Sequence, residues 1–215
     1  MHAKRVADAR ASEHDGRTMR AEAGPVLVLL EGPSDVAALG AVLGRCAPRV
    51  PRTAYRLVDM GGVTNTAAHL RAARADRPSW PVLGLCDEAE SWVVARALQQ
   101  QGVEAGDGAD LAQHGFFVCR RDLEEELIRA LGVEGCLLLL ERAGLGHRFR
   151  SFSRQRVWAD RPVRERLHRF AGVASGRKIL LARQMAAALP AESVPPPLAA
   201  LARSLQELAG ERTRS

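Results

Sequence analysis

The sequence predicts a Rossmann-like α/β fold, in which a four-stranded, mostly parallel sheet is flanked by helices and followed by a C-terminal helical extension. Between residues 25 and 131, short apolar runs alternate with helical segments, the pattern of a parallel sheet with crossover helices. The apolar runs are continuous, as expected for strands that are buried on both faces. After Gly132 only helical periodicity remains, so the sheet should be complete by that point.

The predicted strands end at residues that break a strand or carry a charge. The first run, PVLVLL, ends at Glu31-Gly32, the second at Gly61-Gly62 and the third at Asp87, and a helix that begins at Asp122 follows the fourth. Apolar side chains recur at helical spacing between these runs. The predicted strands are residues 25–30, 55–60, 82–86 and 116–119; the helices between and after them begin at Ser34 and cover 64–75, 89–101 and 122–131.

The remaining chain is divided by composition. Residues 1–23 are charged and Ala-rich and are expected to be a disordered tail before a core at 24–135. An extension at 136–190 should contain helices at 136–143, 163–170 and 177–189, with an irregular basic segment at 147–160. Residues 191–215 combine a Pro-rich break with a short terminal helix whose packing the sequence leaves open.

The net charge of +6 is unevenly distributed along the 215 residues. Residues 142–183 contain twelve Lys or Arg and two acids, so the rest of the chain has a balance of about −4. This asymmetry favours a protein that binds metal with one part and a polyanion with the other; the alternative is a solvated, Arg-rich surface. No apolar stretch approaches a membrane span. The four cysteines lack the spacing of a zinc site, and reduced thiols in a cytoplasm are the expectation.

Carboxylates directly follow two of the buried strands. Because the carboxyl ends of parallel strands meet at one edge of a sheet, Glu31 and Asp87 should lie close together, with Asp35, Asp122 and Glu124 nearby. Such a cluster suits one or two Mg²⁺ ions, or Mn²⁺. Each acid alone is more simply a solvated loop residue, or a helix N-cap in the case of Asp122. A shared ion requires the carboxylates of Glu31 and Asp87 to lie less than about 8 Å apart.

These residues also carry a family resemblance. The segment VLVLLEGPSD, residues 26–35, resembles the opening of the TOPRIM domain, and more closely that of the OLD (overcoming lysogenization defect) nucleases. The resemblance implies that Glu31 and Asp35 bind metal. The segment GLCDEAE resembles the second TOPRIM motif, normally Asp-x-Asp, and implies a metal-binding role for Asp87. Ala89 stands where the second acid is expected.

Neighbouring acids offer a substitute for that missing ligand. Glu88 and Glu90 flank Ala89, and either could take its place. Further along, RRDLEEELIRALG resembles the DLE element of the OLD family, which implies that Asp122 and Glu124 bind a second metal. The segment RFAGVASGRKILLARQMAAAL resembles the family's closing helix, and Lys178 fits its catalytic lysine.

The resemblance covers roughly residues 25 to 190 and is strongest for the short stand-alone actinobacterial type that lacks the ATPase domain. It implies a metal-dependent endonuclease with Glu31, Asp87 and Lys178 as catalytic residues. GVASGRK is not a Walker A loop, since it has three residues between its glycines and Ile179 in the Ser/Thr position. No ATP site is therefore expected, and an ATPase would be a separate partner; a homodimer stays open.

The basic segment is the predicted nucleic-acid contact. Its aromatic residues Phe149, Phe152 and Trp158 favour core packing, with base stacking as the alternative. The predicted phosphate-binding residues are Arg148, Arg150, Arg154, Arg156 and Arg177. Three functions follow: a nuclease that cleaves or nicks DNA, a catalytically weakened TOPRIM protein that binds nucleic acid or regulates a partner, and a TOPRIM enzyme acting on structured RNA. Ala89 motivates the second.

Overall fold

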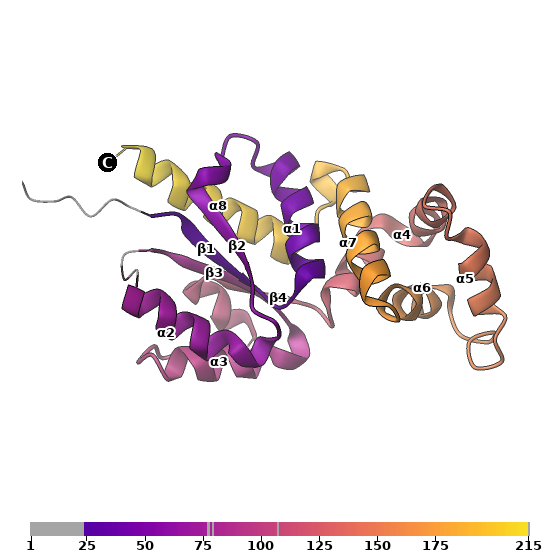
Figure 1. Cartoon of the computed structure of the whole chain (residues 1–215), viewed down its shortest axis with the longest axis horizontal. Coiled ribbons are helices and arrows are strands. Elements are labelled where there is room, and N and C mark those ends of the chain that lie inside the picture. The colour runs from indigo at the N-terminus through magenta and orange to yellow at the C-terminus, as the bar shows by residue number, and fades with distance from the viewer. Residues whose placement is uncertain (1–23, 77, 79, 107, 215) are drawn as a thin grey trace, which may run out of the picture.

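The computed structural model describes residues 24–76, 78, 80–106 and 108–214. The predicted disordered tail, residues 1–23, lies outside these residues. The molecule is elongated, with a sheet and its covering helices at one end and a group of helices at the other (Figure 1). No helix among the described residues has the length and apolar character needed to cross a membrane.

A four-stranded parallel sheet forms the core, as predicted. The strands are β1 (Val26–Leu30), β2 (Tyr55–Asp59), β3 (Val82–Asp87) and β4 (Phe116–Cys119), in the order β2-β1-β3-β4. All three pairings are parallel. Strand β1 lies inside the sheet and every one of its residues is buried, which explains its unbroken run of Val and Leu.

Helices cover both faces of the sheet. Helices α1 (Pro33–Cys46) and α8 (Pro196–Arg214) lie on one face, and α2 (Thr66–Asp76) and α3 (Ser91–Gln99) on the other (Figure 1). One apolar cluster joins Val28 to Leu39 and Leu201, and a second joins Leu29 to Leu70 and Val94. Alternate residues of β1 therefore contribute to two separate cores.

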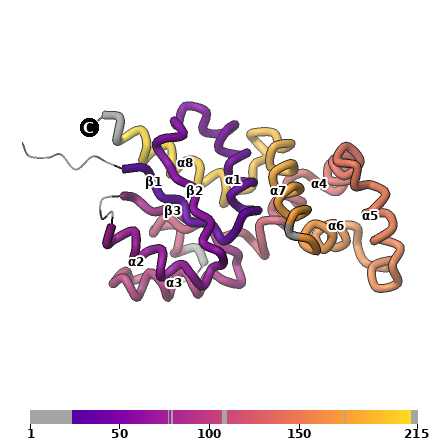
Figure 2. Tube along the Cα trace, viewed as in Figure 1, coloured from indigo at the N-terminus to yellow at the C-terminus, as the bar shows by residue number. Residues whose placement is uncertain are grey.

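The terminal helix is longer than predicted and has a clear packing partner. The chain leaves the sheet after β4, forms the extension, and returns as α8, which contacts β4, β3, β1 and α1 (Figure 2). Leu198, Leu201 and Leu205 of α8 are fully buried. Their i, i+3, i+7 spacing supplies the apolar stripe that the sheet face requires.

The extension contains the rest of the helices. They are α4 (Leu123–Arg142), α5 (Gly146–Ser153), α6 (Val163–Gly172) and α7 (Ser175–Ala188). Short 3-10 segments elsewhere are η1 (Arg52–Ala54), η2 (Val63–Asn65), η3 (Glu88–Glu90), η4 (Gly108–His114) and η5 (Ala191–Ser193). Helix α4 continues through the predicted boundary, but Gly132 has φ 74° and ψ 163°, so the helix is broken there.

The prediction of an irregular segment at 147–160 is wrong for its first half, which is helix α5. Helix α5 is short, and its buried side carries Phe149 and, one turn later, the polar residue Ser153. It therefore lacks the repeated apolar residues by which a helix is recognised in a sequence. Phe149 packs edge-to-face on Phe170 with ring centroids 5.3 Å apart, and Phe152 stacks on Trp158 at 5.3 Å. Phe149 is buried in the core, as the core-packing interpretation predicted, whereas Phe152 and Trp158 are only partly buried.

Candidate metal centre and its basic flank

Two adjacent strands bring Glu31 and Asp87 to the same edge of the sheet. Strand β1 pairs directly with β3, with Leu29 opposite Gly84. Glu31 follows the last residue of β1, and Asp87 is the last residue of β3. The backbone of Glu31 is fixed from the other side, because its carbonyl accepts a hydrogen bond from the Gly62 amide at 2.9 Å. Gly62 has φ 118°, a conformation that favours glycine.

Three carboxylates converge at this edge, and we call Glu31, Asp87 and Glu90 the strand-end cluster. One oxygen of each lies within 4.8 Å of the others. The separation of Glu31 and Asp87 is thus well below the 8 Å limit for a shared ion. Glu90 ends η3, the short turn after β3, and this turn carries it back toward Glu31. Asp87 is the N-cap of this turn, so Asp87 and Glu90 lie at the same edge of the sheet.

Burial and mutual repulsion disfavour the charged forms of this cluster. Burial, together with a hydrogen bond and the charge of Glu90, raises the pKa of Glu31 to about 7. Burial and the charges of Asp35 and Glu31 raise the pKa of Asp87 to about 8. No ion pair among the described residues involves Glu31, Asp87 or Glu90, and Glu90 Oε2 is buried without a hydrogen-bond partner. The cluster therefore lacks neutralising charge of its own.

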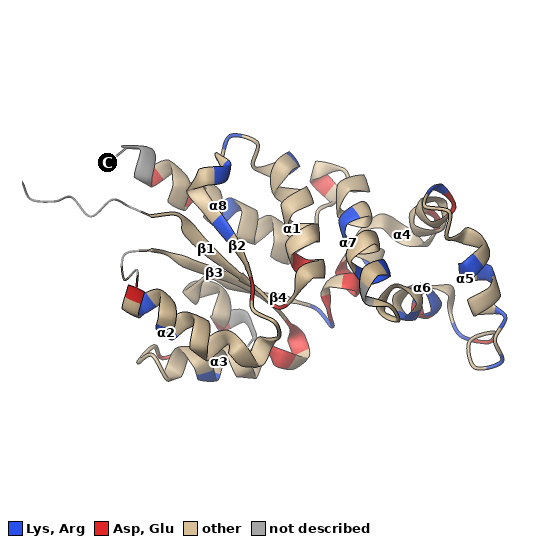
Figure 3. Ribbon diagram, in the orientation of Figure 1, with Lys and Arg blue, Asp and Glu red and all other residues tan. Residues whose placement is uncertain are grey.

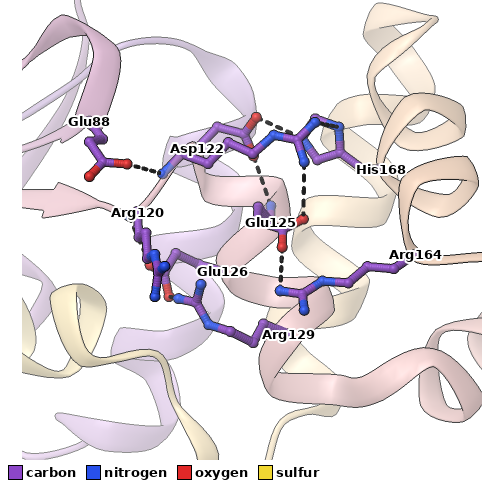
Figure 4. Close-up of polar contacts among 9 residues, drawn as sticks. Glu88, Arg120, Asp122, Glu125, Glu126, Arg129, Arg164 and His168 are labelled. Atoms are coloured by element: carbon purple, nitrogen blue, oxygen red, sulfur yellow. Dashed lines mark hydrogen bonds and ion pairs between the residues drawn. The ribbon is translucent and has the colours of Figure 1, made fainter. Parts of the chain in front are cut away.

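Glu88, the other candidate substitute, has a different position. Its Oε2 accepts a hydrogen bond from the Arg121 backbone amide at 3.1 Å (Figure 4). Arg121 has φ 68° and is the one residue other than glycine with positive φ in the described part of the chain. Glu88 thus stabilises a strained backbone between β4 and α4 and is not grouped with the strand-end cluster.

Asp35 lies in the first turn of α1 and is engaged with that helix. Its Oδ2 accepts hydrogen bonds from the Gly32 amide at 3.2 Å and the Ser34 hydroxyl at 3.3 Å. Burial raises its pKa against the lowering effect of the Lys178 charge, while the Glu31 charge raises it further. Asp35 is thus within electrostatic range of the cluster but outside the three-carboxylate group.

A second acidic group begins α4, and we call Asp122, Glu124, Glu125 and Glu126 the α4 cluster. Asp122 is the N-cap, and its Oδ1 accepts a hydrogen bond from the Glu125 amide at 2.8 Å. Its Oδ2 lies 2.6 Å from His168 Nε2 of α6 (Figure 4). Burial alone would raise the pKa of Asp122, but the hydrogen bonds with His168 and the Glu125 amide outweigh it, and the pKa is lowered.

Each glutamate of the α4 cluster has a cation. Lys178 Nζ of α7 lies 3.4 Å from Glu124 Oε2. Glu125 forms ion pairs with Arg164 of α6 and, at 3.8 Å, with Arg121. Glu126 pairs with Arg129 and accepts a hydrogen bond from the Arg120 amide at 2.9 Å (Figure 4). These three glutamates are buried, so their partners neutralise charge that water does not reach.

The charge of Lys178 acts on both clusters, since it affects the pKa of Glu31 in one and of Glu124 in the other. Burial would lower its pKa, but the charges of Glu124, Asp35 and Asp87 raise it, so the ammonium stays protonated. Its side chain is 40% exposed, which leaves the charge accessible from outside. One oxygen of Glu124, Oε1, is buried without a hydrogen-bond partner.

The predicted phosphate-binding arginines lie in the extension. Acidic residues gather between the sheet and the extension, whereas Lys and Arg are spread over α5, α6 and α7 (Figure 3). Arg148, Arg154 and Arg156 are exposed, and Arg150 pairs with Glu141. Arg177 lies over the Phe170 ring at 3.9 Å. Burial and the charge of Arg148 lower the pKa of Arg177.

Sequence reasoning missed His168 and Arg164. Both lie on α6 one turn apart and contact Asp122 and Glu125, which lie three residues apart on α4. Complementary charges at helical spacing in RERLHRF and DLEEE were the available signal. Nothing in a single sequence fixes which two helices pack together, so the pairing could not be assigned.

No family model and no curated protein matches the sequence. Solved structures do match the fold. The C-terminal region of the Burkholderia pseudomallei OLD protein superposes with a TM-score of 0.62 at 16% identity, covering 86% of this chain and 98% of that one. The C-terminal region of the Xanthomonas campestris pv. campestris OLD protein gives a TM-score of 0.63 at 17% identity, covering 89% and 96%. The chain has the α/β fold of these OLD C-terminal regions, with a four-stranded parallel sheet flanked by helices.

Proposed function

We propose that this chain is a Mg²⁺-dependent phosphodiesterase that cleaves or nicks DNA. The observation that carries the proposal is the strand-end cluster, where oxygens of Glu31, Asp87 and Glu90 lie within 4.8 Å of one another and, among the described residues, form no ion pair. Buried carboxylates in this state are costly unless a proton or a cation joins them. The fold shared with OLD C-terminal regions supports a nuclease-type activity.

The cluster fits a hard divalent cation. All three donors are carboxylate oxygens, which Mg²⁺ and Mn²⁺ prefer, and the set contains no Cys or His that would favour zinc. Glu90 Oε2 is buried without a partner, so the cluster has spare coordinating capacity. Glu90 also supplies the acid that Ala89 lacks, which favours an active site over the weakened one that Ala89 alone suggests.

The second predicted metal site is less available. Both oxygens of Asp122 are engaged, by the Glu125 amide and by His168, and Glu124 is paired with Lys178. We infer that Lys178 provides the positive charge at the position where the sequence predicts a second ion. A single ion at the strand-end cluster, with Lys178 beside it, is the arrangement that these contacts favour.

Each of these residues would have a separate role in the proposed reaction. Glu31, Asp87 and Glu90 hold the ion, which when bound orients a water and stabilises charge on the scissile phosphate. The Lys178 ammonium binds a phosphate oxygen and stabilises its developing negative charge. Glu124 holds Lys178 in place, and Arg177, the preceding residue, binds a flanking phosphate without reading sequence.

A plasmid-nicking assay tests the proposal. Wild type, Glu31→Ala and Asp87→Ala are incubated with supercoiled DNA and Mg²⁺ or Mn²⁺. Wild type should nick the plasmid, and both variants should lose at least about 100-fold in rate, because each removes a ligand from the same ion. A Glu88→Ala variant is the matched control within the same turn.

The assay also separates the alternatives. Equal residual activity in wild type, Glu31→Ala and Asp87→Ala contradicts the nuclease proposal. DNA binding by wild type without any cleavage indicates the weakened, regulatory type. Labelled structured RNA run alongside tests the third function, and cleavage of RNA without cleavage of DNA would identify it.

A further inference from the structure

The extension contains a pocket that the proposed metal centre does not use. It lies between the second half of α4 and helices α5 and α6, and its volume is about 470 Å³. Leu140 and Phe149 form its buried floor, and Leu137 and Val163 add partly buried apolar walls. This volume is within the range of ligand-binding pockets. The pocket belongs to the part of the extension that Figure 1 shows beyond α7, away from the sheet.

Cations surround this apolar floor. Arg150, Arg154 and Arg166 line the pocket together with a single acid, Glu141, and Arg150 pairs with that acid. Among the described residues, Arg154 and Arg166 have no ion-pair partner, and the Arg166 Nε is buried without a hydrogen bond. The lining therefore has a net positive charge. An occupant with an anionic group beside an apolar body would complement both features.

A buried polar group points to the same conclusion. Ser153 lines the pocket, is 8% exposed, and its hydroxyl has no hydrogen-bond partner. An unsatisfied buried hydroxyl costs about 1–3 kcal/mol. A polar contact from an occupant of the pocket would remove that cost, which a purely apolar occupant would not.

Basic residues on α5, α6 and α7 lie between this pocket and the proposed active site (Figure 3). Helix α5 carries Arg150 on the pocket side, and burial and the charge of Arg148, also on α5, lower the pKa of Arg177. Arg177 precedes Lys178, which neighbours the acidic clusters. A phosphodiester chain that contacts Lys178 can therefore follow cationic side chains to α5.

We propose that the pocket binds one nucleotide of a single-stranded nucleic acid, with its base on Leu140 and Phe149 and its phosphates on Arg154 and Arg166. The inference rests on the proposed action on nucleic acid. A base is flat and apolar enough for the floor, and arginine planes both stack on bases and pair with phosphates. A base in a duplex cannot enter, so the pocket would favour substrates with an unpaired segment.

The experiment measures binding in EDTA, where no cleavage occurs. The probe is an oligothymidylate of about 15 nucleotides with one 2-aminopurine, read by fluorescence and anisotropy. Leu137→Trp fills the pocket without changing charge, Arg154→Glu inverts the charge of an exposed lining residue, and Arg142→Glu is a matched charge change outside the pocket. Thermal melting tests whether each variant is folded.

Wild type should change the 2-aminopurine fluorescence on binding. Leu137→Trp and Arg154→Glu should each weaken binding at least about fivefold, and Arg142→Glu less than about twofold. If Leu137→Trp does not fold, Arg154→Glu against Arg142→Glu decides the question.

Two results would overturn the proposal. Unchanged oligonucleotide binding in both pocket variants would show that the pocket is not the contact. Loss of binding to vesicles with anionic lipid in those variants, with oligonucleotide binding intact, would assign the pocket to a lipid headgroup. Failure of plasmid nicking in wild type would contradict the proposed cleavage and leave the EDTA measurement valid, so the two ideas fail separately.

Discussion

Two acidic clusters lie within electrostatic range of Lys178, and they differ in what neutralises them. Every acid of the α4 cluster has its own partner: His168, Lys178, Arg164 or Arg129. The strand-end cluster of Glu31, Asp87 and Glu90 has no ion pair within the described part of the chain, although its members are partly buried and close together. Similar residues thus serve two purposes. One cluster fixes α6 and α7 to the start of α4, and the other is suited to an external cation.

This difference explains why motif order alone is ambiguous. The DLE element and the strand-end acids look equivalent in the sequence, since both are carboxylates at the carboxyl ends of strands. Only the contacts from α6 and α7 distinguish a neutralised carboxylate from one without a partner. Substitutions at Lys178, which borders both clusters, and at the residues of the α4 cluster test whether the two clusters differ in this way.

The largest effect is expected at Lys178. Lys178→Ala should lower the DNA-cleavage rate about 100-fold, because the cation next to the proposed phosphate position is removed. Mg²⁺ affinity, measured by calorimetry, should change little, because the ligands of the strand-end cluster are intact. Glu124→Gln is the informative comparison, since it keeps the size of the side chain and loosens Lys178.

The Glu124→Gln result distinguishes one ion from two. If Lys178 takes the place of the second ion, this variant should lose about tenfold in rate or less. A loss as large as that of Glu31→Ala would show that Glu124 is itself a metal ligand. That result would place both clusters in the metal centre.

A smaller effect is expected on stability at the Glu125–Arg164 pair. Arg164→Met leaves Glu125, which is buried, with only the longer contact to Arg121, so the free energy of unfolding should fall by about 1–2 kcal/mol after allowance for the solvent exposure of Arg164. Urea denaturation measures it. Arg161→Met, which removes an exposed pair with Glu165 at 4.0 Å, should change stability by less than about 0.5 kcal/mol. Equal losses in the two variants would mean that the α4 cluster does not fix α6.

Much of the sheet could be predicted from sequence, because an unbroken run such as Val26–Leu30 records burial on both faces. Local signals also placed Asp122 as an N-cap and set Glu31 and Asp87 at one edge. What sequence could not supply was the packing of distant segments. The partner of Asp122 is His168, which is 46 residues away, and α8 returns to cover a sheet that ended before α4.

Glu90 shows a second limit of sequence reasoning. Glu88 and Glu90 were equal candidates beside Ala89, because each flanks it by one position. The 3-10 turn Glu88–Glu90 separates them, since it directs Glu90 toward Glu31 and Glu88 toward the Arg121 amide. Such a short turn has no periodicity to read, so its side-chain directions follow from the structure alone.

The smallest effect separates the clusters by their response to pH. The pKa of Asp87 is raised from 3.8 to about 8 in the folded, metal-free protein, so the folded state holds a proton that the unfolded state has released. Stability from this group should therefore fall as pH rises from about 4 to about 8 and then level off. Asp122 has the opposite sign, because its pKa is lowered and its contribution is lost only as pH falls through the acid range. In EDTA at about pH 8.5, Asp87→Asn should raise the free energy of unfolding by about 1 kcal/mol or more, whereas Asp122→Asn should lower it.

Mg²⁺ should stabilise wild type more at pH 8.5 than near pH 5.5, since it competes with protons for the strand-end cluster. It should not stabilise Asp87→Asn to the same degree. Thermal melting with and without Mg²⁺ at both pH values measures this, and equal stabilisation of wild type and Asp87→Asn would place the ion outside the strand-end cluster.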